Sequence, residues 1–324
     1  MQQEIRFATF NAFNLAPPGQ QLYDNLLPST PAQYEAKLDW TARQLDLLDA
    51  DVIGFQEIFS QACLRDVLAR TRHYRDAVHV GFDPDPGAER LTPSVALVSR
   101  LPLAAPGEAH ASYPDGVSMP DGSRDNDRFS RAVIHAGIVI SPDCTVDVFV
   151  IHLKSKRPDY RNGDSPDDPL LFGLACLRSL IRRGTEALAL RVLLTGFERV
   201  NGRAQIVLGD FNDVADAVTT TIVMGEGTPM TGRLFDAYQI QKRQDRLRHI
   251  GFSMLHESQY TTIDHILVSE AFHPDLPDAI GEVVNVLYLN DHVVLGQAPA
   301  SDHGQVLARI RLFDETRGLS DAGV

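Results

Sequence analysis

The sequence from residue 204 to residue 213 is Ala204-Gln205-Ile206-Val207-Leu208-Gly209-Asp210-Phe211-Asn212-Asp213. A short apolar run before a glycine is typical of a buried strand, and Gly209 lets the backbone turn where that strand ends. Asp210 and Asn212 are two residues apart, so in extended backbone their side chains point the same way. A carboxylate can orient or deprotonate a water, and an amide can donate to a developing anion. An ordinary turn would use the same residue types, so this stretch alone leaves both interpretations open.

Other predicted strands also carry polar side chains at or near an end. These side chains are Asn11, Glu57, His152, Asp264, Asp302 and His303, at strands predicted over residues 5–10, 51–57, 145–152, 263–268 and 305–313. Each has a simple structural explanation by itself, since Glu57 suits a helix N-terminus and His152 suits a satisfied core histidine. Together they supply oxygen ligands for a hard cation such as Mg²⁺ and hydrogen-bond donors for the oxygens of a phosphate ester.

The hydrophobic pattern mixes helices with strands. Apolar residues at three- and four-residue spacing predict a helix over residues 34–48, and Ser60 can cap a second helix that ends near Arg70. Residues 170–194 predict one long helix, and residues 101–130 predict a long loop or a decorated hairpin near the site. Several further strands are predicted, over residues 77–82, 94–99 and 132–140. Two sheets packed face to face with helices outside would bury these strands on both faces, so the pattern predicts an α/β fold.

Length, composition and charge narrow the protein class. The chain has 324 residues, which allows one large domain or two small ones, and it has no Gly/Ser-rich, Pro-rich or highly charged linker. Its net charge of -13 does not suggest a general polyanion-binding surface. The negative charge is compatible with a cation-binding site, and it does not exclude a local basic groove. It is explained equally well by the need of the protein to stay soluble.

The cysteines and the N-terminus bear on localisation. Cys63, Cys144 and Cys176 are odd in number and widely spaced, which argues against a disulfide framework or a Cys-x-x-Cys metal site and favours a reducing compartment. The N-terminus has no signal-peptide pattern, and no apolar run approaches the ~20 residues that span a bilayer. We therefore expect a cytoplasmic protein without a membrane span, unless a signal segment was removed. The sequence does not indicate the oligomeric state.

Six short motifs occur in order along the chain, namely Thr9-Phe10-Asn11, Phe55-Gln56-Glu57, Ile151-His152-Leu153-Lys154-Ser155, Gly209-Asp210-Phe211-Asn212, Ile263-Asp264-His265 and Ser301-Asp302-His303. In kind and order they resemble the motifs of the endonuclease/exonuclease/phosphatase superfamily, which has the DNase-I-like fold. The resemblance extends from about residue 5 to residue 312. It implies a four-layer α/β sandwich, with two mixed β-sheets packed face to face and helices outside, as a single domain over residues 1–324.

The resemblance also implies a metal site. Glu57 would bind a divalent cation, Asn11 would help through its amide oxygen, and Asp302 would be a further ligand to the metal or to its water. Mg²⁺ is the expected ion, with Mn²⁺ or Ca²⁺ as alternatives, because the ligands are oxygens. The number of ions stays open.

The catalytic roles implied by the resemblance fall on five residues. Asp210 would orient and deprotonate the attacking water, while Asn212 and His152 would hold the phosphoryl oxygens. His303 would contact the phosphate or transfer a proton, with Asp264 fixing its tautomer as a carboxylate does behind a catalytic imidazole. A second Asp-His pair, Asp291-His292, competes for the place of the last motif. We expect Asp302-His303 to occupy that place because it directly precedes the closing strand.

The residues after His152 favour a nuclease. His152-Leu153-Lys154-Ser155-Lys156 resembles the form found in extracellular-type bacterial nucleases and disfavours a role as an abasic-site endonuclease. Basic residues also lie around Arg131 and over residues 242–248. If two of these groups lined the site they would follow a phosphate backbone, although solvated surface charge explains them as well. Arg131 and Lys154 are the expected substrate contacts.

Three functions remain after this reasoning. The first is a divalent-metal-dependent phosphodiesterase, an endonuclease acting on DNA or RNA. The second is a phosphatase or phosphodiesterase of small or lipid-linked phosphates, like the sphingomyelinases and inositol phosphatases of the same superfamily. The third is a non-catalytic binding module on the same fold, which the intact motifs disfavour.

Overall fold

The computed structural model of the chain describes residues 3–84, 90–120, 126–161, 163–226, 232–242, 251–256, 258–296 and 298–313. Within these residues the strands form two six-stranded mixed sheets and one short hairpin. The first sheet has the order β13 (Gly281–Leu289), β14 (Gln305–Leu312), β1 (Glu4–Leu15), β2 (Val52–Ile58), β4 (Ser94–Ser99) and β3 (Val78–Gly81). The second has the order β5 (Glu108–Ser112), β6 (Arg128–Ser141), β7 (Cys144–His152), β8 (Gln205–Asp210), β12 (Asp264–Ser269) and β9 (Leu234–Asp236).

The two sheets pack face to face through a shared apolar core. Val52 and Leu97 of the first sheet belong to the same buried cluster as Val150 and Leu208 of the second. The sheets approach closely at Gly54, where an added Cβ would lie 3.0 Å from side-chain atoms of both Val150 and Leu208. A larger residue at position 54 would therefore require the Val150 and Leu208 side chains to shift, at a cost in packing.

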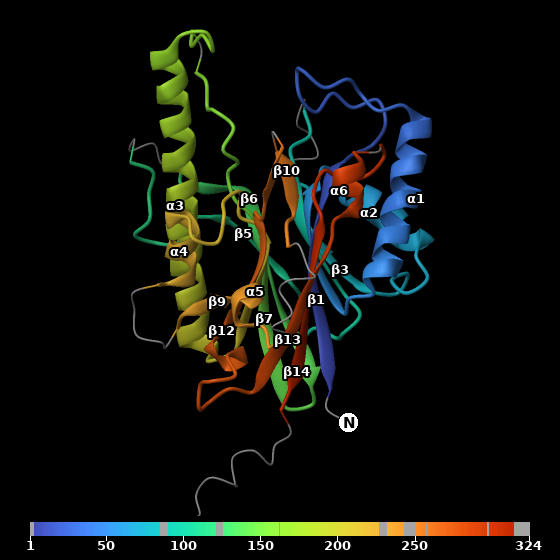
Figure 1. The fold of residues 1–324 in the computed structure, drawn as a ribbon, viewed down its shortest axis with the longest axis vertical. Coiled ribbons are helices and arrows are strands. Elements are labelled where there is room, and N and C mark those ends of the chain that lie inside the picture. Colours follow the sequence, from blue (N-terminus) through green and yellow to red (C-terminus); the bar gives the residue numbers. More distant parts are fainter. Residues whose placement is uncertain are drawn as a thin grey trace, which may run out of the picture.

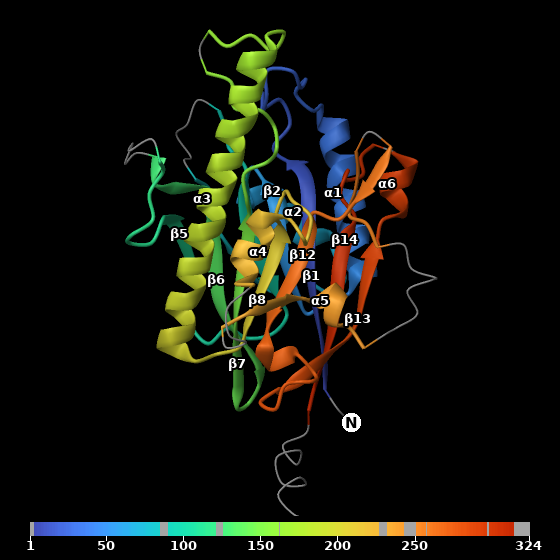
Figure 2. The same ribbon diagram turned by 60° about the vertical axis from the view of Figure 1, so that its left-hand side comes forward.

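Helices cover the outer face of each sheet (Figures 1 and 2). α1 (Pro31–Leu48) and α2 (Gln61–Arg70) pack on the first sheet, where Leu45 and Leu64 share a buried cluster with Phe55. α3 (Pro169–Asn201) and α4 (Val218–Met224) pack on the second, where Leu190 shares a cluster with Phe149. The arrangement is a four-layer α/β sandwich, which confirms the fold expected from the sequence.

Local sequence signals explain where the long helices begin and end. The Thr30 side chain and the Gln33 side chain form a capping box at the start of α1, with Pro31 in the first turn. Asp168 caps the start of α3, and Gly202 ends it with a backbone φ of 60°. The long helix thus extends past the predicted end at residue 194, because Gly202 is the first residue that stops it.

Some regions are more ordered than the sequence pattern indicates. Of the two structures expected within residues 101–130, the described residues show the hairpin, in which β5 pairs with β6. The region before residue 261 contains α5 (Ala237–Ile240) and a hairpin of β10 (Met254–His256) and β11 (Gln259–Thr261). β13 was not predicted, and its pairing with β14 shifts register between Val283 and Asn285, which interrupts the two-residue period.

Strand direction brings the polar motifs to one end of the sandwich. β1 and β2 run parallel and place Asn11 opposite Gln56, next to Glu57. β7 and β8 run parallel in the other sheet and place His152 opposite Asp210. Because parallel strands end at the same edge, the motifs of both sheets meet there. Among the described residues, no helix is both long and apolar enough to cross a membrane.

Candidate active site

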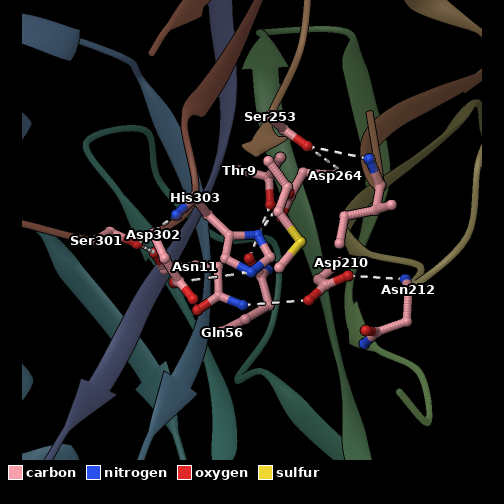
Figure 3. Close-up of polar contacts among 12 residues, drawn as sticks. Thr9, Asn11, Gln56, Asp210, Asn212, Ser253, Asp264, Ser301, Asp302 and His303 are labelled. Atoms are coloured by element: carbon pink, nitrogen blue, oxygen red, sulfur yellow. Dashed lines mark hydrogen bonds and ion pairs between the residues drawn. The ribbon is translucent and has the colours of Figure 1, made fainter. Parts of the chain in front are cut away.

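Asp210 lies at the end of β8, where the two sheets meet (Figure 3), and it is buried. The Asn11 side-chain amide, from the other sheet, donates to Asp210 Oδ2 at 3.2 Å. The backbone N–H of Asn212 donates to Asp210 Oδ1 at 2.7 Å, and Asn212 reaches this position with a φ of 53°. His152 Nε2 lies 3.4 Å from Asp210 Oδ2. Both carboxylate oxygens are thus held in place.

The surroundings of Asp210 change its proton affinity. Burial and then the negative charge of Asp264 raise the pKa of Asp210 to about 7, although the positive charge of His303 acts against them. A carboxylate with this pKa accepts a proton near neutral pH. Burial, together with the positive charges of Arg131 and His303, lowers the pKa of His152 well below its usual value, so His152 is neutral at neutral pH.

Asp264 and His303 form a second buried pair beside Asp210. Asp264 Oδ2 lies 2.8 Å from His303 Nδ1. Burial alone would lower the pKa of His303, but the charge and hydrogen bond of Asp264 and then the charge of Asp210 raise it well above the usual value. His303 therefore carries a positive charge at neutral pH, and its Nε2 lies 3.9 Å from Asp302 Oδ1.

Backbone and hydroxyl contacts fix this pair in position. The Ser253 hydroxyl accepts hydrogen bonds from the backbone N–H groups of Ile263 and Asp264. The Ser301 hydroxyl donates to the carbonyl of Asn11 at 2.7 Å and accepts from the backbone N–H of His303 at 3.0 Å. The loop that carries His303 is therefore tied directly to the strand that carries Asn11.

Among the described residues, Asp210, Asp264 and His303 have potential ligand atoms that all lie within 4.8 Å of one another. The sequence assigned these three residues to catalysis and assigned the metal to Glu57, Asn11 and Asp302. Glu57 and Asp302 are not part of this group, and the carboxylates of Asp210 and Asp264 are compensated by the positive charge of His303.

Glu57 and its neighbours form the oxygen-rich side of the site. Glu57 lies at an irregularity in β2 with a φ of 59°, and the backbone N–H of Asn14 donates to Glu57 Oε2 at 2.9 Å. Burial raises the pKa of Glu57, His303 lowers it, and the negative charge of Asp302 raises it further. Asn11 Oδ1 accepts from the backbone N–H of Phe13 at 3.0 Å, which leaves one of its lone pairs free.

These donors fit a hard divalent cation. Glu57 and Asp302 are carboxylates close enough to destabilise each other's charge, and a cation between them would relieve this repulsion. Within the described part of the chain, the buried oxygens Asn14 Oδ1 and Asp264 Oδ1 have no hydrogen-bond partner. Carboxylate and amide oxygens with spare lone pairs are the ligands that Mg²⁺ and Ca²⁺ prefer.

Lys37 and Asn14 also belong to this side of the site, although the sequence did not point to them. Lys37 Nζ lies 5.6 Å from the ring centre of Phe13 and 5.3 Å from that of Trp40. Burial lowers the pKa of Lys37 to about 8, while the charges of Asp302 and Glu57 oppose this. In the sequence, Lys37 is one polar position on an amphipathic helix, and nothing in that pattern distinguishes it.

The two predicted substrate contacts differ in their surroundings. Arg131 Nη1 donates to the carbonyl of Leu153 at 3.4 Å, and its charge acts on Glu57 and His152, so it lies at the site. Lys154 Nζ instead donates to the carbonyls of Ser155 and Arg157 and to the Ser179 hydroxyl. Its ammonium is engaged within the protein.

The other basic residues near His152 and beyond are partly engaged too. Lys156 pairs with Asp213 at 2.8 Å, and Lys242 pairs with Glu282 at 3.2 Å. Arg243, Arg246 and Arg248 lie outside the described residues.

The structure separates the two Asp-His pairs. His303 contacts Asp264 through its ring. His292, on α6 (Asp291–Leu295), instead has its Nε2 2.8 Å from the backbone carbonyl of His303. The ring of His292 packs against Trp40, with ring centres 5.1 Å apart. His303, and not His292, is therefore the histidine that the structure brings together with Asp264 and Asp210.

Comparison with known proteins bears on the family and the fold of the chain. A model of the Endonuclease/Exonuclease/phosphatase family matches residues 8–303. No curated protein matches the chain.

Solved structures of similar fold include three that span most of the chain. An endonuclease/exonuclease/phosphatase family protein from Bacteroides thetaiotaomicron has a TM-score of 0.60 at 16% identity, over 97% of this chain and 100% of that one. A mannosyl-6-phosphatase from the same organism has a TM-score of 0.56 at 16% identity, over 94% and 99% of the two chains. D. rerio TDP2 complexed with a single strand DNA product has a TM-score of 0.57 at 13% identity, over 95% and 98%. At these identities the likeness shows the fold alone.

Proposed function

Because this chain belongs to the Endonuclease/Exonuclease/phosphatase family, a family of phosphoester hydrolases, we propose that it is a divalent-metal-dependent phosphodiesterase. The observation that supports this best is the 2.8 Å contact between Asp264 Oδ2 and His303 Nδ1, directly beside Asp210. The His303 imidazolium, held by Asp264, thus lies beside the Asp210 carboxylate, which accepts a proton near neutral pH. Hydrolysis of a phosphodiester by water uses one group of each kind.

In the proposed reaction, Asp210 orients a water and accepts its proton. The water oxygen forms a bond to phosphorus while the ester P–O bond breaks, and the departing oxygen receives a proton. His303 can donate that proton from Nε2, because Asp264 occupies its Nδ1 side and fixes the orientation of the ring. The products are a phosphomonoester and an alcohol.

Other side chains would stabilise the phosphoryl oxygens. The Arg131 guanidinium carries a permanent charge near Glu57 and His152. Asn212 uses one side-chain N–H on the carbonyl of Leu153 at 2.9 Å, which leaves the other for substrate. A divalent cation, held by Glu57 and Asp302 with help from Asn11, would supply Lewis-acid stabilisation of the same oxygens.

The identity of the substrate is a separate question. Nucleic acid was the first choice from the sequence, on account of the basic residues after His152. Lys154 and Lys156 are both engaged in contacts within the protein, which weakens that argument. DNA or RNA therefore stays a prediction, and the second candidate stays a phosphatase or phosphodiesterase of small or lipid-linked phosphates.

A small diester tests the reaction without assuming the natural substrate. We expect hydrolysis of bis-p-nitrophenyl phosphate with Mg²⁺, Mn²⁺ or Ca²⁺, loss of turnover in EDTA, and recovery when metal is added back. His303→Ala should lower kcat by roughly 10²–10⁴-fold. His73→Ala, a change at an exposed histidine, is the matched control. Full activity in EDTA, or equal activity of the two variants, would contradict the proposal. Plasmid, single-stranded DNA and RNA assayed in parallel test the nucleic-acid prediction.

A further inference from the structure

A cavity of about 560 Å³ opens beside the catalytic residues. Its walls come from the loop after β1, the first turns of α1, the β10 strand, α6 and the loop before His303. In Figure 1 these segments lie together at the end of the molecule where β1 ends. The volume falls within the range of roughly 300–1,000 Å³ that is usual for small-molecule sites.

The cavity shares residues with the active site, so it is continuous with it. Asn14, whose backbone holds Glu57, lines one wall. Ser301 and Asp302, from the loop that carries His303, line another. A substrate whose phosphate lies at Glu57 and His303 therefore has this cavity next to one of its ester groups.

The lining of the cavity is largely apolar. It includes Phe13, Leu22, Leu26, Leu255, Val293 and Pro299. Among the described lining residues, Lys37 and Asp302 are the charged ones, and the negative charge of Asp302 acts on Lys37 to raise its pKa against the effect of burial. Charge is thus confined to the end of the cavity that adjoins the active site.

Several apolar side chains of the lining are left open to solvent. Phe13 is 36% exposed, Leu26 is 38% exposed and Leu27 is 89% exposed. Grouped exposed apolar side chains on a monomer commonly mark a binding site, because covering them removes apolar surface from water. A polynucleotide backbone would instead require cationic groups at successive phosphates.

We propose that this cavity binds the apolar chain of an amphiphilic phosphodiester, with the phosphate at its Asp302 and Lys37 end. The inference rests on the proposed phosphodiesterase function and names its substrate class, an alkyl or acyl group joined through phosphate. The charge pattern supports this orientation, since the ionic part of such a molecule meets Lys37 and the bound cation while its chain meets Phe13, Leu22 and Leu255.

A chain-length series tests the inference. The substrates are methyl, butyl and octyl p-nitrophenyl phosphate, each of which releases p-nitrophenol. Each methylene buried in an apolar site improves binding by about fourfold, so kcat/KM should increase steeply from methyl to butyl and level off when the cavity is filled. Thymidine 5′-p-nitrophenyl phosphate serves as the nucleotide comparison.

Variants locate the effect in the cavity. Ala36→Phe adds a ring at an exposed helix position that lines the cavity, and Leu255→Gln makes one wall polar. Both should reduce the octyl-to-methyl ratio of kcat/KM by at least about fifteenfold, the value of two buried methylenes. Ala62→Phe, at an exposed alanine of α2 away from the cavity, should leave the ratio as in the wild type. Unchanged thermal unfolding confirms that each variant is folded.

The outcomes distinguish the inference from the function on which it rests. Hydrolysis of the methyl ester without any gain from chain length would overturn the apolar cavity and leave the phosphodiesterase intact. If Ala36→Phe and Leu255→Gln both retain the increase in kcat/KM with chain length, the alkyl chain binds outside this cavity. A higher kcat/KM for the thymidine ester than for the octyl ester would favour a nucleic-acid substrate. If no ester is hydrolysed, the proposed function fails. In that case, calorimetric binding of octyl phosphate but not of methyl phosphate would support the proposal that the cavity binds an apolar chain. Equal binding of the two compounds, or no binding, would overturn that proposal.

Discussion

The His303 ring has a carboxylate near each of its two nitrogens, and these charges determine its protonation state. Asp264 contacts its Nδ1 at 2.8 Å, and Asp302 lies 3.9 Å from its Nε2. Because Asp264 and Asp210 keep the pKa of His303 high, the ring stays protonated in the range where Asp210, with a pKa of about 7, can lose its proton. A charged acid and a basic carboxylate therefore coexist near neutral pH.

Removing the charge of Asp264 tests this arrangement. Asp264→Asn keeps the shape of the side chain but lowers the proton affinity of His303 and leaves its tautomer undefined. We expect kcat on bis-p-nitrophenyl phosphate to decrease by roughly 10²–10⁴-fold with little change in KM. The control is Asp275→Asn at an exposed aspartate, which should behave as the wild type. A near-wild-type kcat in Asp264→Asn would remove this residue from the proposed mechanism.

Individual residues also show how far the sequence could predict the site. Asn11, Asp210, Asp264 and His303 were predictable as site residues because each is a polar residue at or near one end of an apolar strand. Lys37 was not predictable, because it approaches Asp302 only through the way α1 packs against the first sheet. Asn14 was passed over because its importance comes from a backbone N–H and a φ of 56°, which no side-chain pattern reveals.

At the scale of elements, buried polar contacts fasten the long helix to the second sheet. Asp147 of β7 is fully buried and accepts hydrogen bonds from His135 of β6 at 3.1 Å and Asn201 of α3 at 3.0 Å. Burial would raise the pKa of Asp147, but these hydrogen bonds and the charges of His135 and Arg203 together lower it. The sequence could predict α3 from its apolar period, but it could not predict this contact, which joins residues 54 positions apart.

The depressed pKa of Asp147 predicts a stability that depends on pH. The unfolded pKa is about 3.9, so the contribution is present above that value and is lost as the pH falls through the lower folded value. Asp147→Asn should therefore reduce the free energy of unfolding by about 1–3 kcal/mol at pH 7. The difference from the wild type should shrink below about pH 4, measured by urea unfolding. Asp143→Asn, at an exposed neighbour, is the control, and a loss that does not depend on pH would contradict the charge argument.

At the scale of the whole molecule, the two sheets share one core. Val52 and Leu97 pack in the same cluster as Val150 and Leu208, so neither sheet buries its inner face without the other. The layers were predictable from mixed helix and strand patterns. The cavity beside the site was not, because its walls come from residues between 13 and 302 that meet only in the folded chain.

The shared core predicts that both sheets unfold together. The single tryptophan, Trp40, lies on α1 and reports on the layers around the first sheet, whereas far-ultraviolet circular dichroism reports on all helices and strands. We expect the two signals to give coincident urea transitions. Trp40 fluorescence that changes at a clearly different urea concentration would show that the halves unfold separately.

Gly54 has a consequence for catalysis that extends beyond packing. Because Gly54 has no side chain, the two sheets can lie close together there. An added Cβ would lie 3.0 Å from side-chain atoms of Val150 and Leu208. Asn11 and Glu57 belong to one sheet, while His152 and Asp210 belong to the other, so the same spacing sets how far apart the two halves of the proposed catalytic site lie. The rate of hydrolysis would thus report on the spacing between the two sheets. Compressing or widening the sandwich, by pressure or by a distant core substitution, would change turnover without touching a substrate.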